Sequence, residues 1–176
     1  MSVSAGDYSY GTPQIRWACS GANYRCGKFC SIAGNVTIYL GGNHRPDWIT
    51  TYPFGHINKE TFHTFDGKGH PATKGDVTIG NDVWVGDNST IMSGITIGDG
   101  AVIANNSHVV KDVRPYSIVG GNPAREIKLR FTEEQIETLL KIQWWNWPIA
   151  KINAFLPTLC SGNIKEFLEK AAIPQA

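Results

Sequence analysis

Histidine side chains are the most promising chemical groups in this chain, and four of the five lie between positions 44 and 70. An imidazole has a pKa of about 6.5, so it can accept a proton near neutral pH without being protonated already. His44 stands out because polar and aromatic residues surround it in the segment NHRPDW. We therefore take His44 as a candidate proton acceptor, against the alternative of a loop histidine with no chemical role.

Three further histidines, His56, His63 and His70, follow at intervals of seven residues and raise the question of a metal site. Neither a strand nor a helix brings residues seven positions apart to a single point. We therefore expect these three side chains to be solvated loop histidines, and we predict no metal site.

The four cysteines, Cys19, Cys26, Cys30 and Cys160, are expected to be reduced thiols. A chain of this size without a secretion signal is expected in a reducing compartment. Cys26 and Cys30 also lack the second cysteine pair that would complete a zinc site. We predict neither a disulfide nor a redox or metal role for them.

The overall charge is nearly balanced, with 16 Lys and Arg against 15 Asp and Glu in 176 residues. Such a balance does not favour a nucleic-acid backbone or an anionic membrane surface as a partner. No segment approaches the roughly 20 apolar residues of a membrane span, and the first residues do not have the pattern of a signal peptide. The sequence thus predicts a cytoplasmic protein that binds neither nucleic acid nor membrane.

A six-residue repeat dominates the middle of the chain and must position the histidine segment. Its leading column is β-branched and apolar throughout, at Ile79, Val85, Ile91, Ile97, Ile103 and Val109. A second column of small or branched residues follows four positions later, at Val83, Ser89, Ile95, Ala101, Ser107 and Val113. This spacing is typical of a hexapeptide parallel β-helix, whereas an amphipathic helix needs intervals of three and four.

In such a fold each hexapeptide forms a short strand and a corner, and stacked coils bury the aliphatic columns. Corner residues that tolerate left-handed backbone angles recur at positions 81–82, 87–88, 99–100 and 105–106. The register extends back to Cys26, so this thiol fills an aliphatic slot of the core. His108 is expected at a corner, with a structural role.

The repeat is lost between Gly42 and about Thr73, where aromatic, histidine and turn-forming residues prevail. An insertion of this length in a regular coil is expected to be a functional loop. We therefore predict a β-helix domain over residues 1–130, with an excursion loop at about 43–73, and a C-terminal helical cap over residues 131–176.

Three helices are predicted in that cap. Thr132 and Gln135 are placed to form a capping box for the first, and Pro148 suits the first position of the second. Ser161 is placed to cap a third helix from about Asn163 to Ala171. Helices here are expected to cover the last coil, whose free strand edges would otherwise invite pairing with another chain.

Four segments together carry a family resemblance: NHRPDWITTYPF, the tract from GDVTIGNDVWVG to SHVVKDV, PYSIVGGNPAREIKLRF and IQWWNWP. In combination they resemble the xenobiotic acetyltransferase branch of the hexapeptide acyltransferases, which includes streptogramin and chloramphenicol O-acetyltransferases. The resemblance runs from about Cys26 to Pro148. It implies an all-β solenoid, a left-handed parallel β-helix with an inserted active-site loop and C-terminal helices. It also implies a homotrimer with active sites between neighbouring subunits.

The resemblance further implies that His44 is the general base, which takes a proton from a hydroxyl or amine as that group attacks the thioester of acetyl-coenzyme A. It places Trp84 at an outward coil position, beside His44 and the reactive end of this co-substrate. Asp47 is expected either to orient His44 or to touch the acceptor.

Coenzyme A is expected to lie along the coils, where the corner at Ala104 offers backbone groups. Its phosphates are expected to meet the cations at the tail of the coil, Lys111, Arg125 and Lys128, through charge-assisted hydrogen bonds. The aromatic residues Tyr8, Tyr10 and Trp17 resemble the positions that pack a bulky acceptor in this family. The acceptor itself is left open between an antibiotic and a sugar.

Two other functions compete with acetyl transfer. A zinc hydratase of the gamma carbonic anhydrase type needs three histidines that converge between subunits, and the repeats supply no pair to complete that set with His44. A non-catalytic β-helix scaffold leaves His44, Trp84 and the long loop unexplained. Acetyl transfer accounts for all three features, and we therefore favour it.

Overall fold

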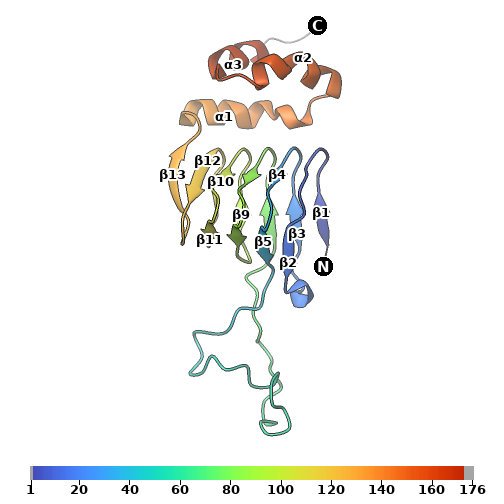
Figure 1. The fold of residues 1–176 in the computed structure, drawn as a ribbon, viewed down its shortest axis with the longest axis vertical. Coiled ribbons are helices and arrows are strands. Elements are labelled where there is room, and N and C mark those ends of the chain that lie inside the picture. The colour runs from blue at the N-terminus through green and yellow to red at the C-terminus, as the bar shows by residue number, and fades with distance from the viewer. Residues whose placement is uncertain (1, 173–176) are drawn as a thin grey trace. The chain divides into compact units, whose positions relative to one another are not determined.

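The computed structural model describes residues 2–172 of the chain, which divides into two compact units, Met1–Lys128 and Leu129–Ala176. The first unit is built from short strands, and the second from helices (Figure 1). The strands are β1 (Val3–Ala5), β2 (Gln14–Arg16), β3 (Tyr24–Cys26), β4 (Ser31–Ile32), β5 (Thr37–Tyr39), β6 (Val77–Ile79), β7 (Trp84–Val85), β8 (Thr90–Ile91), β9 (Thr96–Ile97), β10 (Val102–Ile103), β11 (His108–Val109), β12 (Ser117–Gly120) and β13 (Arg125–Leu129).

These strands form three sheets. Sheet A has the order β1-β3-β6-β9, sheet B the order β13-β12-β10-β7-β4, and sheet C the order β11-β8-β5-β2. Consecutive strands from β3 to β11 therefore visit sheets A, B and C in turn, and the pairings between them are parallel. Val102 pairs with Trp84, eighteen residues earlier, so three hexapeptides complete one circuit.

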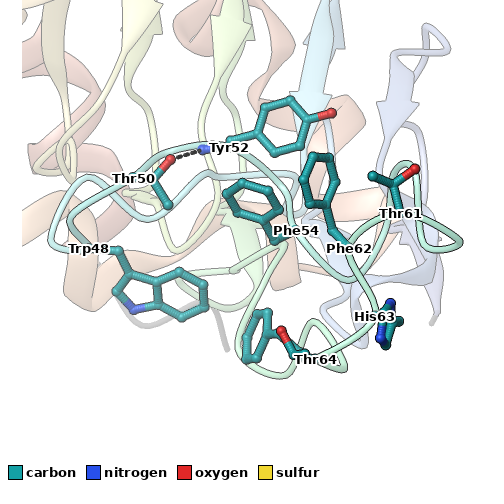
Figure 2. A pocket seen from close by; sticks show the side chains of 9 residues that line it. Trp48, Thr50, Tyr52, Phe54, Thr61, Phe62, His63 and Thr64 are labelled. Atoms are coloured by element: carbon teal, nitrogen blue, oxygen red, sulfur yellow. Dashed lines mark hydrogen bonds between the residues drawn. The ribbon is translucent and has the colours of Figure 1, made fainter.

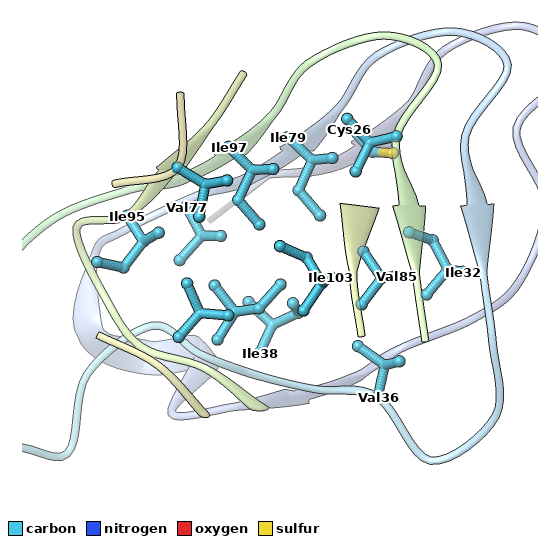
Figure 3. Packing of buried hydrophobic residues seen from close by; sticks show 14 of the residues in the cluster. Cys26, Ile32, Val36, Ile38, Val77, Ile79, Val85, Ile95, Ile97 and Ile103 are labelled. Carbon is cyan, nitrogen blue, oxygen red and sulfur yellow. The ribbon is translucent and has the colours of Figure 1, made fainter. Parts of the chain in front are cut away.

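The apolar columns of the repeat form the core of this unit. Every residue of both predicted columns from Ile79 to Val113 is buried. Figure 3 shows two rows of like side chains turned toward the middle of the coil, Cys26, Ile79 and Ile97 in one and Ile32, Val85 and Ile103 in the other. The prediction that Cys26 is a core residue is confirmed, Cys30 is buried as well, and all four cysteines are free thiols.

The corners follow the predicted turn residues. Asp82, Asn88 and Asn106 have φ values of 53°, 57° and 57°, in the left-handed region that Asn and Asp tolerate. The corners also stack, because the Asn81 side chain accepts a hydrogen bond from the Lys28 amide at 2.9 Å. Side-chain ladders of this kind satisfy backbone amides that the short strands leave unpaired.

The coil begins one turn earlier than the readable repeat. β1 pairs with β3, Tyr10 forms a bridge with Ser31, and β2 pairs with β5, so residues 3–16 touch each sheet once. The hexapeptide pattern does not reveal this turn, because Ala5 and Gly11 stand where the core column has larger residues. His108 is a smaller correction: it lies in strand β11 opposite Thr90 rather than at a corner.

The second unit contains α1 (Glu133–Ile142), α2 (Ile149–Leu159) and α3 (Ile164–Ala172). The predicted capping box is confirmed: the Gln135 amide donates to the Thr132 hydroxyl at 3.3 Å, and the Thr132 amide donates to the Gln135 side chain at 3.1 Å. Within the unit, the Trp147 ring contacts Phe155 at a centroid distance of 4.9 Å and Phe167 at 6.1 Å.

The predicted starts of the second and third helices were wrong in detail. Pro148 occupies the cap before α2 rather than the first helical position. The third helix is capped by Asn163 rather than Ser161, because the Asn163 side chain accepts from the Glu166 amide at 3.2 Å. Ser161 supports that cap by accepting from the Asn163 amide at 3.2 Å. The prediction that the helices cover the last coil stays a prediction.

Candidate active site

The excursion loop, residues 43–73, leaves the coil after β5 and returns before β6 (Figure 1). A small antiparallel bridge closes its base, where the Asn43 amide donates to the Ala72 carbonyl at 3.0 Å and the Ala72 amide donates to the Asn43 carbonyl at 2.8 Å. The Asn43 side chain also donates to the buried Ser93 hydroxyl of the coil at 2.9 Å. The bridge thus fixes the residues on either side of it, which include His44.

Trp17 lies against the same base. Gly42 has a φ of 80°, and a Cβ atom on it would come within 2.1 Å of the Trp17 indole nitrogen. Only glycine leaves room for this close approach. Of the three aromatic residues predicted to pack the acceptor, Trp17 is therefore the one that lies beside the loop base.

His44 is exposed, and its ring is held by one hydrogen bond, from Nδ1 to the Thr51 carbonyl at 2.7 Å. A carbonyl oxygen can only accept, so Nδ1 carries the proton of the neutral ring. Nε2 then keeps its lone pair, and no second hydrogen bond to the ring forms within residues 2–172. This tautomer has the free nitrogen that a proton acceptor needs.

Asp47 pairs with Arg45 rather than with His44. The Arg45 guanidinium donates to both oxygens of the Asp47 carboxylate, at 2.8 Å and 2.5 Å, and lies 5.0 Å from the centre of the Trp48 ring. These hydrogen bonds lower the pKa of Asp47 to about 2. The orientation of His44, one of the two roles predicted for Asp47, is thus performed by the Thr51 carbonyl.

His70 corrects another expectation, because it is not solvated. Its side chain is only 8% exposed, and neither ring nitrogen has a hydrogen-bond partner within residues 2–172. Its ring meets the His44 ring edge to face, with centroids 4.6 Å apart and planes at 88°. Burial, and then the neighbouring His44 and His56, lower the pKa of His70, so it stays neutral near neutral pH. His56 and His63 are exposed, as predicted.

An aromatic pocket of about 530 Å³ lies further out in the loop (Figure 2). Its lining comprises Trp48, Thr50, Tyr52, Phe54, Thr61, Phe62, His63, Thr64 and Phe65. The Phe54 ring contacts Tyr52 at 4.7 Å and Phe62 at 5.1 Å, and Figure 2 shows Trp48 across from these rings. Its volume lies in the range of small-molecule sites, which are about 300–1,000 Å³ and mostly apolar.

The cations predicted to bind phosphate lie at the tail of the coil. Lys111 and Arg125 line a cleft of about 280 Å³ together with Arg114. Arg114 is engaged by Glu126 in a bidentate pair at 2.7 Å and 2.8 Å, which also lowers the pKa of Glu126. No carboxylate in the described part of the chain pairs with Lys111 or Arg125. Their charges are available to a ligand.

The remaining predicted residues are spread over the surface of the coil. Lys128 is exposed on β13 and does not line the cleft. Ala104 directly follows β10. Its methyl group lies close to Gly120, because a Cβ atom added to Gly120 would come within 3.2 Å of it. Tyr8 stacks on Phe29 at 4.9 Å.

Trp84 is 51% exposed on the outer face of sheet B. Among residues 2–172 no hydrogen bond or ring contact joins it to His44. One chain therefore does not bring together the two residues that the resemblance places side by side.

Comparison with known proteins connects this geometry to a family. The family model for bacterial transferase hexapeptide repeats (six repeats) matches residues 76–111. A probable macrolide acetyltransferase of Lysinibacillus sphaericus is 51% identical over 146 residues, which are 82% of this chain and 81% of that protein. The chain belongs to the xenobiotic acetyltransferase branch of the hexapeptide-repeat acyltransferases.

Two further members of the hexapeptide acetyltransferases support this assignment. A chloramphenicol acetyltransferase of Klebsiella aerogenes is 49% identical over 78% of this chain, and the matched region spans just under two thirds of that protein, 66%. The solved structure of a hexapeptide-repeat acetyltransferase of Vibrio cholerae O1 biovar eltor, complexed with acetyl-coenzyme A, has a TM-score of 0.54 at 26% identity. It covers 74% of this chain and 61% of its own.

The described residues contain no group of three histidine, cysteine or acidic side chains arranged to hold a metal ion. None of the helices found there has the length and apolar character that crossing a membrane requires.

The sequence did not reveal two features of the site. The Thr51 contact uses a backbone carbonyl, which any residue type could supply. The burial of His70 depends on the closed loop base, which pairs Asn43 with Ala72 across the whole insertion. The even spacing of His56, His63 and His70 in the sequence suggested three equivalent histidines, and only the fold distinguishes them.

Proposed function

We propose that the protein transfers an acetyl group from acetyl-coenzyme A to a hydroxyl or amino group of a small-molecule antibiotic, with His44 as general base. The observation that carries this proposal is the His44 ring, exposed at the loop base with Nδ1–H held by the Thr51 carbonyl and Nε2 free. The names of the relatives, a chloramphenicol and a probable macrolide acetyltransferase, favour an antibiotic over a sugar as the acceptor.

In this mechanism Nε2 of His44 takes the proton of the acceptor hydroxyl while the oxygen of that hydroxyl forms a bond to the thioester carbon. The bond between that carbon and sulfur then breaks, and the coenzyme A thiolate receives the proton from His44. The Thr51 carbonyl keeps Nδ1 protonated throughout and stabilises the imidazolium that forms between the two transfers. A general base of this kind contributes about a hundred- to ten-thousand-fold to the rate.

Coenzyme A is proposed to bind along the coil toward the cleft of Lys111 and Arg125. The unpaired cations there fit phosphate, which Arg and Lys bind through charge-assisted hydrogen bonds. Lys128 adds a third positive charge on the neighbouring strand, and the small side chain of Ala104 leaves room for a close approach to the coil. The aromatic pocket of the loop is proposed to receive the apolar part of the acceptor, and Trp17, which lies beside the loop base, is proposed to contact the acceptor nearer to the coil.

A homotrimer is proposed because the outer faces of the three sheets differ. Sheet A presents Ser4, Arg25, Thr78 and Thr96 in register, and sheet C presents Gln14, Thr37, Thr90 and His108. Sheet B instead presents Ser31, Trp84, Val102 and Ile118. An apolar row on an outer face, formed here by Trp84, Val102 and Ile118, favours burial against another copy. Contact through sheet B would let Trp84 of one subunit approach His44 of the next.

Two finer features complete the proposal. The coil is proposed to be a left-handed β-helix, as in the hexapeptide family, although a right-handed crossover is the general rule for parallel strands. A cytoplasmic location is proposed because both the antibiotic target and acetyl-coenzyme A would be met there.

The test follows free thiol release from acetyl-coenzyme A with a panel of acceptors: chloramphenicol, a macrolide, a streptogramin A compound and a nucleotide-linked amino sugar. We expect at least one antibiotic to be acetylated. Turnover of the sugar alone would show that the acceptor class is wrong. No turnover, together with no thermal stabilisation by millimolar coenzyme A, would contradict acetyl transfer itself, because a bound ligand must raise the melting temperature.

A further inference from the structure

His70 is a buried histidine, and the proposed mechanism gives it no role. It is 8% exposed inside a loop whose residues are mostly exposed, and neither ring nitrogen has a partner among residues 2–172. A buried polar ring without hydrogen bonds destabilises the folded state. A histidine in such a position needs an explanation in terms of what it contacts.

The His70 ring contacts three other rings, those of Trp48 at 6.5 Å, His56 at 5.4 Å and, at the shortest distance, His44. The bridge between Asn43 and Ala72 places the residue after Asn43 opposite the segment that contains His70. The two rings then meet edge to face at 4.6 Å. The His70 amide donates to the Gly67 carbonyl at 3.1 Å, so its own backbone is fixed as well.

This contact supplies a constraint that the hydrogen bond to Thr51 cannot. One hydrogen bond, from Nδ1 to the Thr51 carbonyl, leaves the His44 ring free to swing about that bond. A ring packed perpendicular to it, at 88°, blocks the swing and defines the plane of the imidazole. The lone pair of Nε2 then points in one direction. A general base requires this, because proton transfer depends on the alignment of that lone pair with the proton it takes.

We propose that His70 is a positioning residue, which fixes the ring plane of His44 through the perpendicular ring contact while the Thr51 carbonyl fixes its tautomer. This inference rests on the proposed role of His44 as general base. Packing of the ring, and not hydrogen bonding by its nitrogens, performs the role. His70 must also remain neutral, because a second positive charge beside a protonated His44 would oppose its action as a base.

The experiment compares His70→Ala, His70→Phe and His70→Asn with Lys68→Ala, a change of an exposed side chain in the same loop outside the proposed site. His70→Ala is expected to lower kcat about ten- to a hundredfold, since small misplacements of a catalytic group cost up to about a hundredfold. The KM for acetyl-coenzyme A is expected to change less than about twofold, because the proposed cofactor cleft is elsewhere. His70→Phe keeps a flat ring and is expected to restore most of kcat, whereas Lys68→Ala has the activity of the unchanged protein.

A second measurement reads His44 without turnover. Long-range ¹H–¹⁵N correlation spectra of the histidine rings are expected to show one Nδ1–H tautomer of His44 in the unchanged protein and in His70→Phe. In His70→Ala we expect a mixture of tautomers, because a ring that swings widely breaks its hydrogen bond to the Thr51 carbonyl, and that carbonyl then no longer fixes the tautomer. Stabilisation by coenzyme A checks that each variant is folded.

The outcomes separate this inference from the proposed function. If no acceptor is turned over by the unchanged protein, acetyl transfer fails, and the spectra still decide the contact between His70 and His44. A His70→Ala variant with unchanged tautomer and kcat would overturn the positioning role. So would recovery by His70→Asn without recovery by His70→Phe, since that would assign the effect to hydrogen bonding.

Discussion

The coil and the excursion loop hold their side chains in opposite ways. In the coil each core residue packs between like residues of the turns before and after it, as Val85 does between Ile32 and Ile103. In the loop each contact is made once: one bridge at Asn43, one hydrogen bond at His44, one ion pair at Arg45. Repetition stabilises the coil, whereas the loop depends on individual contacts.

This difference suggests where chemistry can change without loss of the fold. A coil residue is part of a column, so its replacement disturbs neighbours above and below. A loop residue such as His44 is exposed, and we expect its removal to leave the bridge and the coil intact. We expect substitutions in the loop to alter activity and substitutions in the coil to alter stability, with little overlap.

The largest effect is expected from His44→Ala. Acetyl transfer should fall about a hundred- to ten-thousand-fold, because the base is lost, while the melting temperature and coenzyme A binding stay close to those of the unchanged protein. Thiol release and thermal unfolding with and without coenzyme A measure the two properties. A variant that keeps more than about a tenth of the rate would show that another group is the base.

The matching change in the coil is Ile91→Ala. Ile91 is fully buried, and its column neighbours cannot close the space, so the free energy of unfolding is expected to fall by about 2–5 kcal/mol. Thr90→Ala, on the outward side of the same strand, is the control, and we expect it to cost less than about 0.5 kcal/mol. Urea unfolding at one chain concentration measures both. Equal losses of unfolding free energy in the two variants would contradict the claim that Ile91 belongs to a buried core column and Thr90 does not.

The outer faces of the coil offer a sharper comparison within one region. Val102→Lys, on sheet B, is expected to break the proposed trimer into smaller species, because a charge enters an apolar interface. Thr96→Lys, on the polar face of sheet A, should leave the assembly unchanged. Sedimentation equilibrium at micromolar concentration distinguishes the two. A monomeric unchanged protein would remove the interface and the shared active site.

Much of the coil was predictable and much of the loop was not, for a physical reason. The leading column from Ile79 to Val109 contains six apolar residues at regular intervals, so a single irregular residue would not hide the pattern. His44 was found through its flanking residues and their family resemblance. The carbonyl of Thr51, the burial of His70 and the contact of Trp17 with Gly42 each arise once, from the closing of the loop base. Nothing in the one-dimensional pattern repeats them.

A smaller effect is expected where coil and ligand meet. The double change Arg125→Glu and Lys128→Glu should weaken stabilisation by coenzyme A, and more so at low salt, because exposed charges are screened by ions. Lys59→Glu with Lys68→Glu, two exposed loop residues, makes the same change in net charge and should leave the shift in melting temperature unchanged. Equal losses in both pairs would mean that only overall charge matters, and that the cleft is not the phosphate site.

The smallest effect is a pH dependence of loop closure. Burial, and then His44 and His56, lower the pKa of His70 below its ordinary value of 6.5, so the closed loop binds a proton there less readily than the open loop does. The contribution of a neutral His70 is therefore complete above pH 6.5 and is lost as the pH falls below it, toward the lowered pKa. Asp47, with a pKa of about 2, stays charged across this range and adds no change.

Amide hydrogen exchange of residues 43–73, corrected for the intrinsic rate at each pH, should show more frequent opening at pH 5.5 than at pH 7.5. His70→Phe keeps His44, His56 and Arg45 in place but has no proton to gain, so its opening should depend less on pH. An equal pH dependence in both proteins would assign the effect to the other two histidines and leave His70 without a titrating role.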